Sequence, residues 1–285
     1  MTTLADTEAA SRLARHREER AAAAAAKRGP VSFFWGDFVT EPGTRVSGAP
    51  GTWAPREAGR PGLQVTATAD DGILLGGRLV DGTADLFAEA GDGPLVAEFP
   101  DGAEGIVFSY DGTKHALQVW NPQSEWARRF AGISAYDHDP AWVVPAQVRL
   151  IDSDRTVALT HHRDPRPVDV PVLAEIRFLW EGEEHVLLGT GSGPGRGGIT
   201  VLVSDATSGQ GSYAAGRVLH LPEIAGHGHG RTQTETVLDF NYLSLLPCAF
   251  SLAWNCPIPP AENTLPIPIR AGERHAIDHD GRNIL

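Results

Sequence analysis

The sequence predicts a mainly β fold with two packed β units, sandwich-like in the N-terminal half and barrel-like in the C-terminal half, preceded by an N-terminal α-helix. Three observations predict this fold. From residue 31 onward, short apolar runs recur between Gly, Pro and Asp residues. Asp-Gly pairs stand between several of these runs, and many closely spaced short strands are typical of sandwiches and barrels. The first 30 residues instead consist mostly of strong helix formers.

The N-terminal segment is predicted to be a helix over residues 4–28. Ala, Leu, Arg and Glu dominate it, and the run from Ala21 to Ala26 contains no helix breaker. Gly29 and Pro30 end the pattern, as glycine and proline do at helix C-termini. The apolar stripe of the helix is thin. We therefore expect it to lie on a β domain or on a partner subunit, where it would form a homodimer.

Strands are predicted over 31–35, 63–68, 73–75, 84–88, 94–99, 105–109, 115–120, 143–151, 156–159, 171–180, 185–189, 199–203, 216–220, 235–239 and 266–269. Residues 123–131 are expected to form one or two helical turns. The Asp-Gly sites predict hairpins, because glycine accepts the positive φ of primed turns; they are Asp70-Asp71-Gly72, Asp81-Gly82, Asp92-Gly93 and Asp111-Gly112. A boundary near 133–145 predicts a helix (1–30), a sandwich-like unit (31–140) and a barrel-like unit (141–285) with an irregular Pro- and Cys-rich end.

Charge and hydropathy exclude several classes of protein. The 285 residues include 24 Lys and Arg against 36 Asp and Glu, a formal net charge of -12. Nucleic-acid binding and adhesion to anionic membranes both rely on basic surfaces, so neither partner is expected. No run of about 18 apolar residues predicts a transmembrane helix. The charged N-terminus does not resemble a secretory signal, so a cytoplasmic location is expected. Frequent Ala and Arg with rare Lys resemble the usage of a high-GC bacterial genome.

A resemblance to a known family rests mainly on C-terminal motifs. They are the segment from Asp205 through Tyr213 to Arg217, the run Leu238-Asp239-Phe240-Asn241, Pro247-Cys248, Cys256-Pro257 with Glu262-Asn263, and Ile269 to Glu273. Phe33-Phe34-Trp35 and Arg129-Phe130 add weaker similarity. The sequence resembles the bacterial and archaeal domain-of-unknown-function family 1684 over most of residues 30–274. The resemblance implies a mostly β protein and no agreed activity. Its first half also resembles a small sandwich of the forkhead-associated kind, although the phosphothreonine-binding residues have no match in 43–60.

One departure from the family pattern concerns the segment after Asn241. The family usually has a polar stretch with Arg, Tyr and Asn before the Pro-Cys pair, whereas this chain has Tyr242-Leu-Ser-Leu-Leu-Pro247. An apolar replacement predicts an altered or repurposed site. With Leu245 and Tyr242 on its wall, a pocket there would suit a hydrophobic molecule.

Cys248 and Cys256 are the two cysteines of the chain. Three interpretations stay open: buried structural thiols, a reversible or reactive thiol pair, and metal ligands that would need further Cys, His or carboxylate partners. The histidines His220, His227 and His229 are near in sequence, but the last two alternate with glycine, as in a solvated loop.

Polar residues near the predicted strand ends also have two interpretations each. Asp239 and Asn241 would point to the same side of the chain and form a polar site, or would cap loop backbone. Glu262 and Asn263 carry the same ambiguity. Arg217 would bind a carboxylate or phosphate, or would form a structural ion pair with Asp205 or Asp239.

Two other patterns are given no chemical role. His161 and His162 are adjacent, so on a strand they face opposite ways and do not chelate one metal easily. The glycine-rich loop 189–198 lacks the Lys-Ser/Thr ending of a phosphate loop and precedes a strand.

The leading functional hypothesis is a small-molecule-binding enzyme acting on a hydrophobic organic substrate in a β-barrel pocket, with no cofactor and no metal. Asp239 would be the general base, Arg217 would hold an anionic group, and Tyr213 and Cys248 would complete the catalytic set. The predicted substrate-binding residues are Asn241, Tyr242, Leu245, Cys256, Glu262 and Asn263. The alternatives are a non-catalytic binding or protein-interaction module and a Cys/His metalloprotein.

Overall fold

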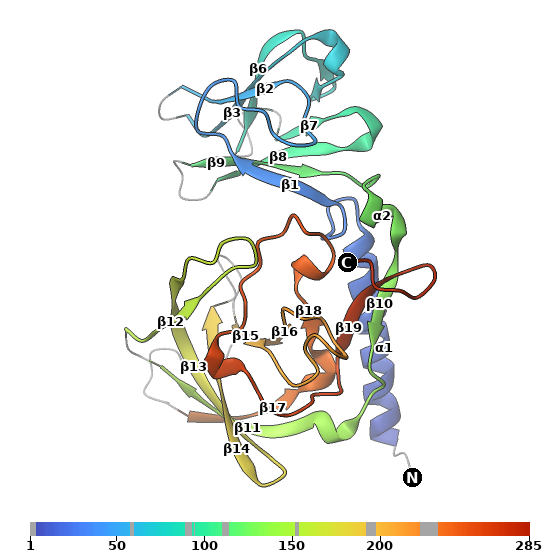
Figure 1. Ribbon diagram of the computed structural model, residues 1–285, viewed down its shortest axis with the longest axis vertical. Helices are drawn as coiled ribbons and strands as arrows, with labels where there is room; N and C mark the ends of the chain where they lie inside the picture. Colours follow the sequence, from blue (N-terminus) through green and yellow to red (C-terminus); the bar gives the residue numbers. More distant parts are fainter. Residues whose placement is uncertain are drawn as a thin grey trace. The chain divides into compact units, whose positions relative to one another are not determined.

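The computed structural model describes residues 4–57, 60–88, 93, 95–109, 114–151, 154–191, 198–222 and 233–285. The chain is mainly β with one long N-terminal helix, as predicted (Figure 1). Its contacts divide it into two compact units. The half-barrel unit comprises Met1–Ala21, Ala131–Ala249 and Asn255–Leu285, and the sandwich unit comprises Ala22–Phe130 and Phe250–Trp254. The predicted division into residues 1–30, 31–140 and 141–285 stays a prediction.

The N-terminal helix α1 spans Leu4–Ala25, so it ends three residues before the predicted end at residue 28. The chain leaves the helix through turns in which the Gly29 N–H donates to the Ala26 carbonyl oxygen at 2.7 Å. A Cβ atom at Gly29 would lie 2.3 Å from the carbonyl oxygens of Ala23 and Ala24. Only glycine therefore allows the chain to return this close to the helix end.

The sandwich unit contains two antiparallel sheets. A six-stranded sheet has the order β1-β9-β8-β7-β4-β5, and a three-stranded sheet has the order β2-β3-β6. The strands are β1 (Phe33–Phe38), β2 (Thr52–Pro55), β3 (Gly62–Ala67), β4 (Leu74–Leu75), β5 (Arg78–Leu79), β6 (Gly82–Phe87), β7 (Val96–Glu98), β8 (Glu104–Ser109) and β9 (His115–Trp120). Short helical segments are η1 (Ala69–Asp71), η2 (Pro100–Gly102) and α2 (Glu125–Arg129). Trp53, Leu63 and Leu86 of one sheet and Leu117 and Val119 of the other share one buried core.

Two of the predicted hairpins are wrong, because their turns do not connect neighbouring strands of one sheet. The turn at Asp71-Gly72 joins β3 to β4, and the turn at Asp81-Gly82 joins β5 to β6, so each connects strands of different sheets. Gly72 does adopt a left-handed conformation, with φ of 66°. A sandwich needs connections that cross between its sheets, and a left-handed glycine serves such a crossing as well as a hairpin. Asp92 and the pair Asp111-Gly112 lie outside the described residues.

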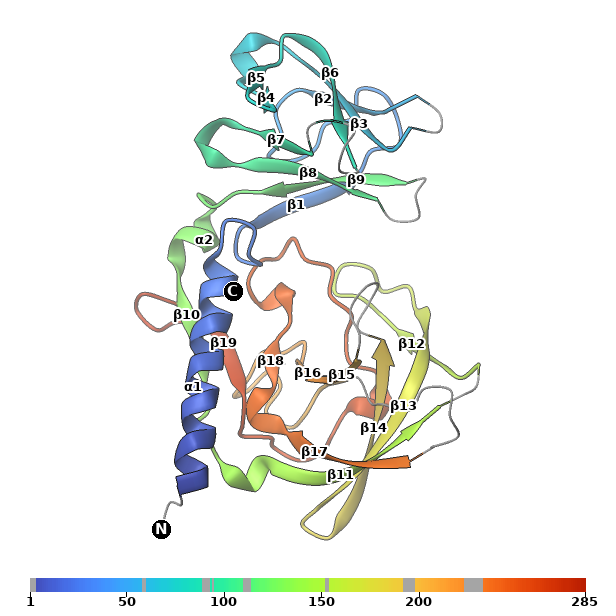
Figure 2. The same ribbon diagram turned by 180° about the vertical axis from the view of Figure 1, so that it is seen from behind.

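The half-barrel unit is built on an eight-stranded antiparallel sheet that curls into a half-barrel. The strand order is β17-β11-β13-β14-β15-β16-β18, with β12 paired to β13. These strands are β11 (Val143–Leu150), β12 (Thr156–Leu159), β13 (Val168–Trp180), β14 (Glu183–Gly191), β15 (Ile199–Val203), β16 (Arg217–Leu221), β17 (Gln233–Asp239) and β18 (Ser244–Leu245). A separate ribbon pairs β10 (Phe130–Ala135) with β19 (Glu273–Asp278), and Figure 2 shows α1 running beside it. Short 3-10 turns are η3 (Pro140–Trp142), η4 (Phe240–Tyr242), η5 (Pro247–Ala249) and η6 (Ala261–Asn263).

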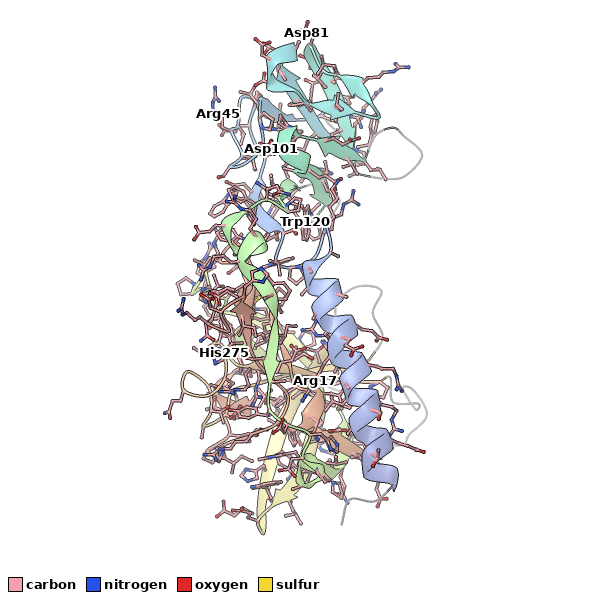
Figure 3. All side chains as sticks on the ribbon, turned by 90° about the vertical axis from the view of Figure 1, so that its right-hand side faces the viewer. Arg17, Arg45, Asp81, Asp101, Trp120 and His275 are labelled. Atoms are coloured by element: carbon pink, nitrogen blue, oxygen red, sulfur yellow. The ribbon has the colours of Figure 1, made fainter. Side chains whose placement is uncertain are left out.

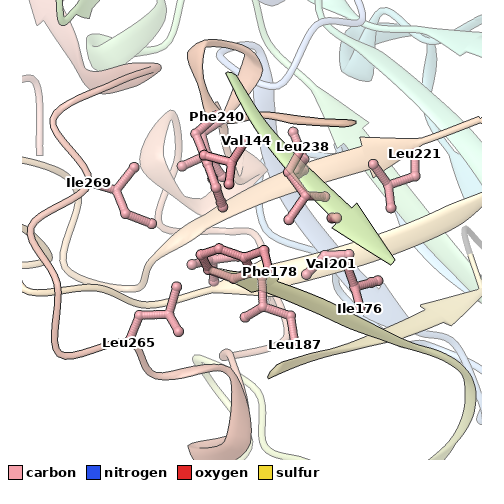
Figure 4. Close-up of a cluster of buried hydrophobic side chains, with 14 of the residues drawn as sticks. Val144, Ile176, Phe178, Leu187, Val201, Leu221, Leu238, Phe240, Leu265 and Ile269 are labelled. Carbon is pink, nitrogen blue, oxygen red and sulfur yellow. The ribbon is translucent and has the colours of Figure 1, made fainter. Parts of the chain in front are cut away.

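The concave side of the curled sheet is filled by the chain's own C-terminal segment. Phe240, Leu243, Leu265 and Ile269 from the irregular segment pack against the inward residues of the strands, as the close-up in Figure 4 shows in part. Each of these four side chains is at most 4% exposed. The half-barrel is therefore a solid core.

The predicted strand at 266–269 is wrong. Residues 266–269 carry no strand, although Leu265, which precedes them, and Ile269, the last of them, are buried in the core. Pro266 and Pro268 remove two backbone donors, so the segment cannot complete a ladder. Its apolar character reflects burial without strand pairing.

Helix α1 is fastened to the half-barrel unit by polar contacts. The Arg20 guanidinium donates to both carboxylate oxygens of Glu273, at 2.9 and 3.0 Å, and Glu273 also accepts the Leu245 N–H. Arg17, labelled in Figure 3, donates to the Tyr136 carbonyl oxygen at 2.7 Å. The helix thus lies on a β unit of its own chain, one of the two placements expected; a homodimer through it stays a prediction. Among the described residues, no helix combines the length and apolar character needed to cross a membrane.

Candidate functional site

Arg217, predicted to hold an anionic substrate group, is fully buried at the start of β16. Its Nη2 donates to Asp205 Oδ2 at 2.7 Å and to the Ile269 carbonyl oxygen at 2.9 Å, and its Nη1 donates to the carbonyl oxygens of Ala271 and Glu273. Both partners of the ion pair have no exposed side-chain surface. A guanidinium whose two terminal nitrogens are already occupied by protein acceptors has little capacity left for a substrate.

The Arg217 network ties three segments of the half-barrel together. Asp205 Oδ1 accepts the Thr207 N–H at 2.8 Å and the Ile269 N–H at 3.2 Å. The loop after β15, strand β16 and the segment 269–273 therefore meet at one buried charge pair. This is the structural ion pair with Asp205 that the sequence left open, and it does not serve the anion-binding role predicted for Arg217.

Asp239, predicted to be the general base, caps the turn that follows β17. Its Oδ1 accepts the Asn241 N–H at 3.0 Å and the Asn241 side-chain amide at 2.9 Å. Asn241 in turn exchanges hydrogen bonds with the backbone of Asp139. Both side chains are thus engaged in holding loop backbone, which is the capping interpretation of this pair.

The predicted substrate-binding residues also have structural partners. Asn263 is 1% exposed; it accepts the Leu188 N–H and donates to the carbonyl oxygens of Leu188 and Leu202. Leu245 is 2% exposed, and the Tyr242 ring packs in a tilted arrangement against the His16 ring of α1, with 4.9 Å between ring centroids. Glu262 is an exposed residue of η6. The apolar stretch 242–246 therefore contributes to the core and to the contact with α1, and its role in a substrate pocket stays a prediction.

An enclosed void near these residues is too small for an organic substrate. Beside Asn263 lies a void of about 10 Å³ lined by residues such as Leu159, Leu188 and Leu202. That volume holds about one water molecule. This void therefore cannot hold the predicted organic substrate.

Tyr213, Cys248 and Cys256 do meet, but in a buried cluster. The Tyr213 hydroxyl donates to the Cys248 carbonyl oxygen at 2.8 Å, and the Cys248 N–H donates to Cys256 Sγ at 3.0 Å. The described residues contain no group of three or more His, Cys, Asp or Glu side chains placed to hold a metal ion. His227 and His229, and most of the glycine-rich loop 189–198, lie outside the described residues.

A groove of about 710 Å³ lies on the opposite, convex side of the curled sheet. Its floor crosses β17, β11 and β13, where Val237 pairs with Pro145 and Leu179 follows the pair Ala146–Phe178. Leu179 is 63% exposed and Val237 52%. Three apolar side chains therefore form a continuous outward row, which we call the apolar row: Val237, Pro145 and Leu179.

Polar residues border the apolar row. Gln147 stands between Glu235 and Arg177 in the register of the three strands. Arg177 donates to Glu184 at 2.8 Å and to Glu175 at 3.5 Å, so its charge is already compensated. Hydrogen bonds from Arg149, and then from Arg155, hold the pKa of Glu175 below its usual value against the opposing effect of burial. Glu235 is exposed, and no ion pair of the described residues includes it. The groove thus combines an apolar floor with one uncompensated carboxylate.

The sequence contains a pattern that indicates this groove, but the strand predictions considered only the alternation of apolar and polar residues. In β13, buried Ile176 and Phe178 alternate with the polar outward residues Glu175 and Arg177, and Leu179 continues the outward series with an apolar side chain. Val237 and Pro145 do the same on their strands. Apolar residues on the polar phase of three neighbouring strands are the pattern that predicts an exposed apolar row.

The comparison with protein families places the groove and the thiol cluster in one matched region. The model described as "Protein of unknown function (DUF1684)" matches residues 128–274, slightly more than half of the chain. The chain belongs to the DUF1684 family. The DUF1684 region runs from the end of α2 to the start of β19, so it contains the half-barrel sheet, the Arg217 network and both cysteines.

A solved structure is also similar to part of this DUF1684 member. An uncharacterized protein of Haloarcula marismortui, determined by solution NMR, is 31% identical over a match that covers 53% of this chain and 80% of that chain, with a TM-score of 0.42. No curated protein matches the sequence.

Proposed function

We propose that the protein binds a small amphipathic organic cation, such as an alkylammonium ion, in the groove on the convex face of the half-barrel. The observation that carries this proposal is the exposed apolar row beside the uncompensated Glu235 carboxylate, within a groove of about 710 Å³. Ligand sites of this size commonly combine apolar walls with a few polar groups that fix orientation.

The expected pose follows from the order of residues across the sheet. The apolar body of the ligand lies over Leu179, Pro145 and Val237, where it covers surface that is now exposed. The ammonium group pairs with Glu235. An anionic ligand is disfavoured, because Arg177 is engaged by Glu184 and Glu175 while the lining contributes two carboxylates.

Binding without catalysis is the function we favour over an enzyme. The residues predicted to do acid-base chemistry hold backbone or one another in the core, and they do not line this groove. This proposal keeps the small hydrophobic molecule of the sequence-based hypothesis and moves its site to the other face of the sheet.

The test is a titration of the full-length protein with octylamine at pH 7, followed by backbone amide chemical shifts, with octanoate and octanol as charge controls. We expect octylammonium to shift amides of β11, β13 and β17 and to bind more tightly than octanoate. Glu235→Gln should weaken octylammonium binding by about fivefold at low salt. Leu179→Ser should weaken it by about tenfold.

Glu183→Gln is the matched control, because Glu183 is an exposed glutamate on β14 that does not line the groove. Its affinity for octylammonium should equal that of the unaltered protein. Equal binding of octanoate, or shifts confined to residues outside the groove, would contradict the proposal. Concentration-dependent dimerisation that Leu179→Ser abolishes would also contradict it, since the apolar row would then be covered by a second copy of the chain.

A further inference from the structure

The chain's two cysteines lie against each other in the half-barrel unit, although strand structure is sparse around them. The Cys248 N–H donates to Cys256 Sγ at 3.0 Å, so the Cys256 sulfur lies directly against the main chain of Cys248. Cys248 is 0% exposed and Cys256 5%. With one sulfur this close to the main chain of the other cysteine, local side-chain adjustment can bring the two sulfurs to bonding distance.

The surroundings make the two thiols chemically unequal. Hydrogen bonding from the Cys256 thiol lowers the pKa of Cys248, burial opposes this, and the Tyr213 hydroxyl lowers it further. The hydrogen bond with Cys248, together with burial, raises the pKa of Cys256. Burial and the neighbouring Cys248 raise the pKa of Tyr213, so its hydroxyl stays protonated and remains a donor. One thiol is thus favoured as the thiolate nucleophile and the other as the resolving thiol.

We propose that Cys248 and Cys256 are a modification site, at which a hydroperoxide converts the two thiols into an intramolecular disulfide. The Cys248 thiolate attacks one oxygen of hydrogen peroxide, the O–O bond breaks, and the departing hydroxide takes a proton to become water. This leaves a sulfenic acid on Cys248. The Cys256 sulfur then attacks Cys248 Sγ, and the sulfenic hydroxyl leaves with the Cys256 proton as a second water. Two thiols are oxidised, and one peroxide is reduced to two waters.

The disulfide would close a short excursion of the chain. Residues 249–255 connect the two cysteines, which both belong to the half-barrel unit. Five of the connecting residues, Phe250–Trp254, belong to the sandwich unit. Within that unit, the Ser251 hydroxyl donates to the Phe33 carbonyl oxygen at 2.7 Å and the Trp254 ring packs 4.2 Å from that of Phe33. The covalent bond would therefore close the loop that contains these five residues.

The test uses the reduced full-length protein. It is treated with hydrogen peroxide, and catalase then removes the remaining peroxide. The protein is denatured, alkylated with N-ethylmaleimide and analysed by intact-protein mass spectrometry. We expect the mass of a monomer that has lost two hydrogens and carries no maleimide. After reduction with dithiothreitol, the same protein should react with two maleimides. Near-UV circular dichroism before denaturation checks that the oxidised chain is folded.

Single variants separate the two roles. With peroxide and dimedone, Cys256→Ser should accumulate the dimedone adduct of a sulfenic acid, whereas Cys248→Ser should give much less adduct. Tyr213→Phe should slow disulfide formation several-fold without preventing it. Two maleimides on the peroxide-treated protein, disulfide-linked dimers, or oxidation to sulfinic acid without a disulfide would each overturn the proposal.

Discussion

Arg217 and Asp205 illustrate how one buried charge pair can determine local structure. Removing two charges from water is costly, and the pair is tolerated because protein groups occupy the terminal guanidinium nitrogens and both carboxylate oxygens. The network connects segments that carry no regular ladder of their own. Its members are therefore fixed by one another, which explains why family motifs in this region need not indicate chemistry.

Replacing Arg217 by Met is expected to destabilise the protein by about 3–5 kcal/mol, because Asp205 would be left as an uncompensated buried carboxylate. Arg270→Met is the matched control, since Arg270 is exposed, and should change stability by less than about 0.5 kcal/mol. Urea unfolding at pH 7 measures both. Equal effects of the two substitutions would show that the network adds no stability.

For single residues, the sequence predicted two possible roles each but could not distinguish between them. The pairing of Arg217 with Asp205 was one of two ion pairs left open, and the capping role of Asp239 was weighed against a polar site. Spacing places Asp239 and Asn241 near each other, but only the tertiary structure shows that the Asn241 side chain exchanges two hydrogen bonds with the backbone of Asp139. Long-range partners are not encoded in local periodicity.

At the scale of elements, alternation and helix propensity predicted most strands and the helix, because these signals are local. The failures have identifiable causes. Residues 266–269 are apolar because they cross a core. Strand β19, with the sequence Glu273-Arg-His-Ala-Ile-Asp278, was missed because polar residues dominate it. Its buried positions are set by pairing with β10 and by the contact of Glu273 with α1.

Arg20→Ala is expected to loosen α1 and to lower stability by about 1–3 kcal/mol, since Glu273, with a side chain 5% exposed, would lose its bidentate partner. Hydrogen-deuterium exchange should rise in α1 before it rises in β11 or β13. Arg15→Ala, at an exposed position of the same helix, should leave exchange unchanged. Unaltered exchange of α1 in Arg20→Ala would contradict this role of the ion pair.

At the scale of the whole molecule, the two units have separate cores. Trp53, Leu63 and Leu117 belong to one cluster, and Ile176, Phe178 and Phe240 belong to the other. The fold class could be predicted from the sequence, because the strands that form each core show alternating apolar and polar residues. The groove did not follow, because it depends on which outward residues of three strands become neighbours, and that is set by sheet order and register.

Ile176→Ala and Leu63→Ala test whether each core supports its own unit. Each removes a side chain that is 0% exposed and should cost about 2–5 kcal/mol. We expect Ile176→Ala to raise amide exchange chiefly in β11, β13 and β14, and Leu63→Ala to raise it chiefly in β2, β3 and β6. A uniform rise across all these strands in both variants would mean that the units unfold as one.

The ion pair between Arg20 and Glu273 spans 253 positions of the chain, which has a consequence for protein synthesis. The ribosome therefore makes Glu273 on the order of 10 to 50 s after Arg20, at typical elongation rates of roughly 5–20 residues per second. The sandwich unit and most of the half-barrel emerge during this interval. During this time the nascent helix lacks its ion-pair partner. Its many charged residues and thin apolar stripe keep it compatible with water until Glu273 has been made. The contact between Arg20 and Glu273 can form only after Glu273 has been made.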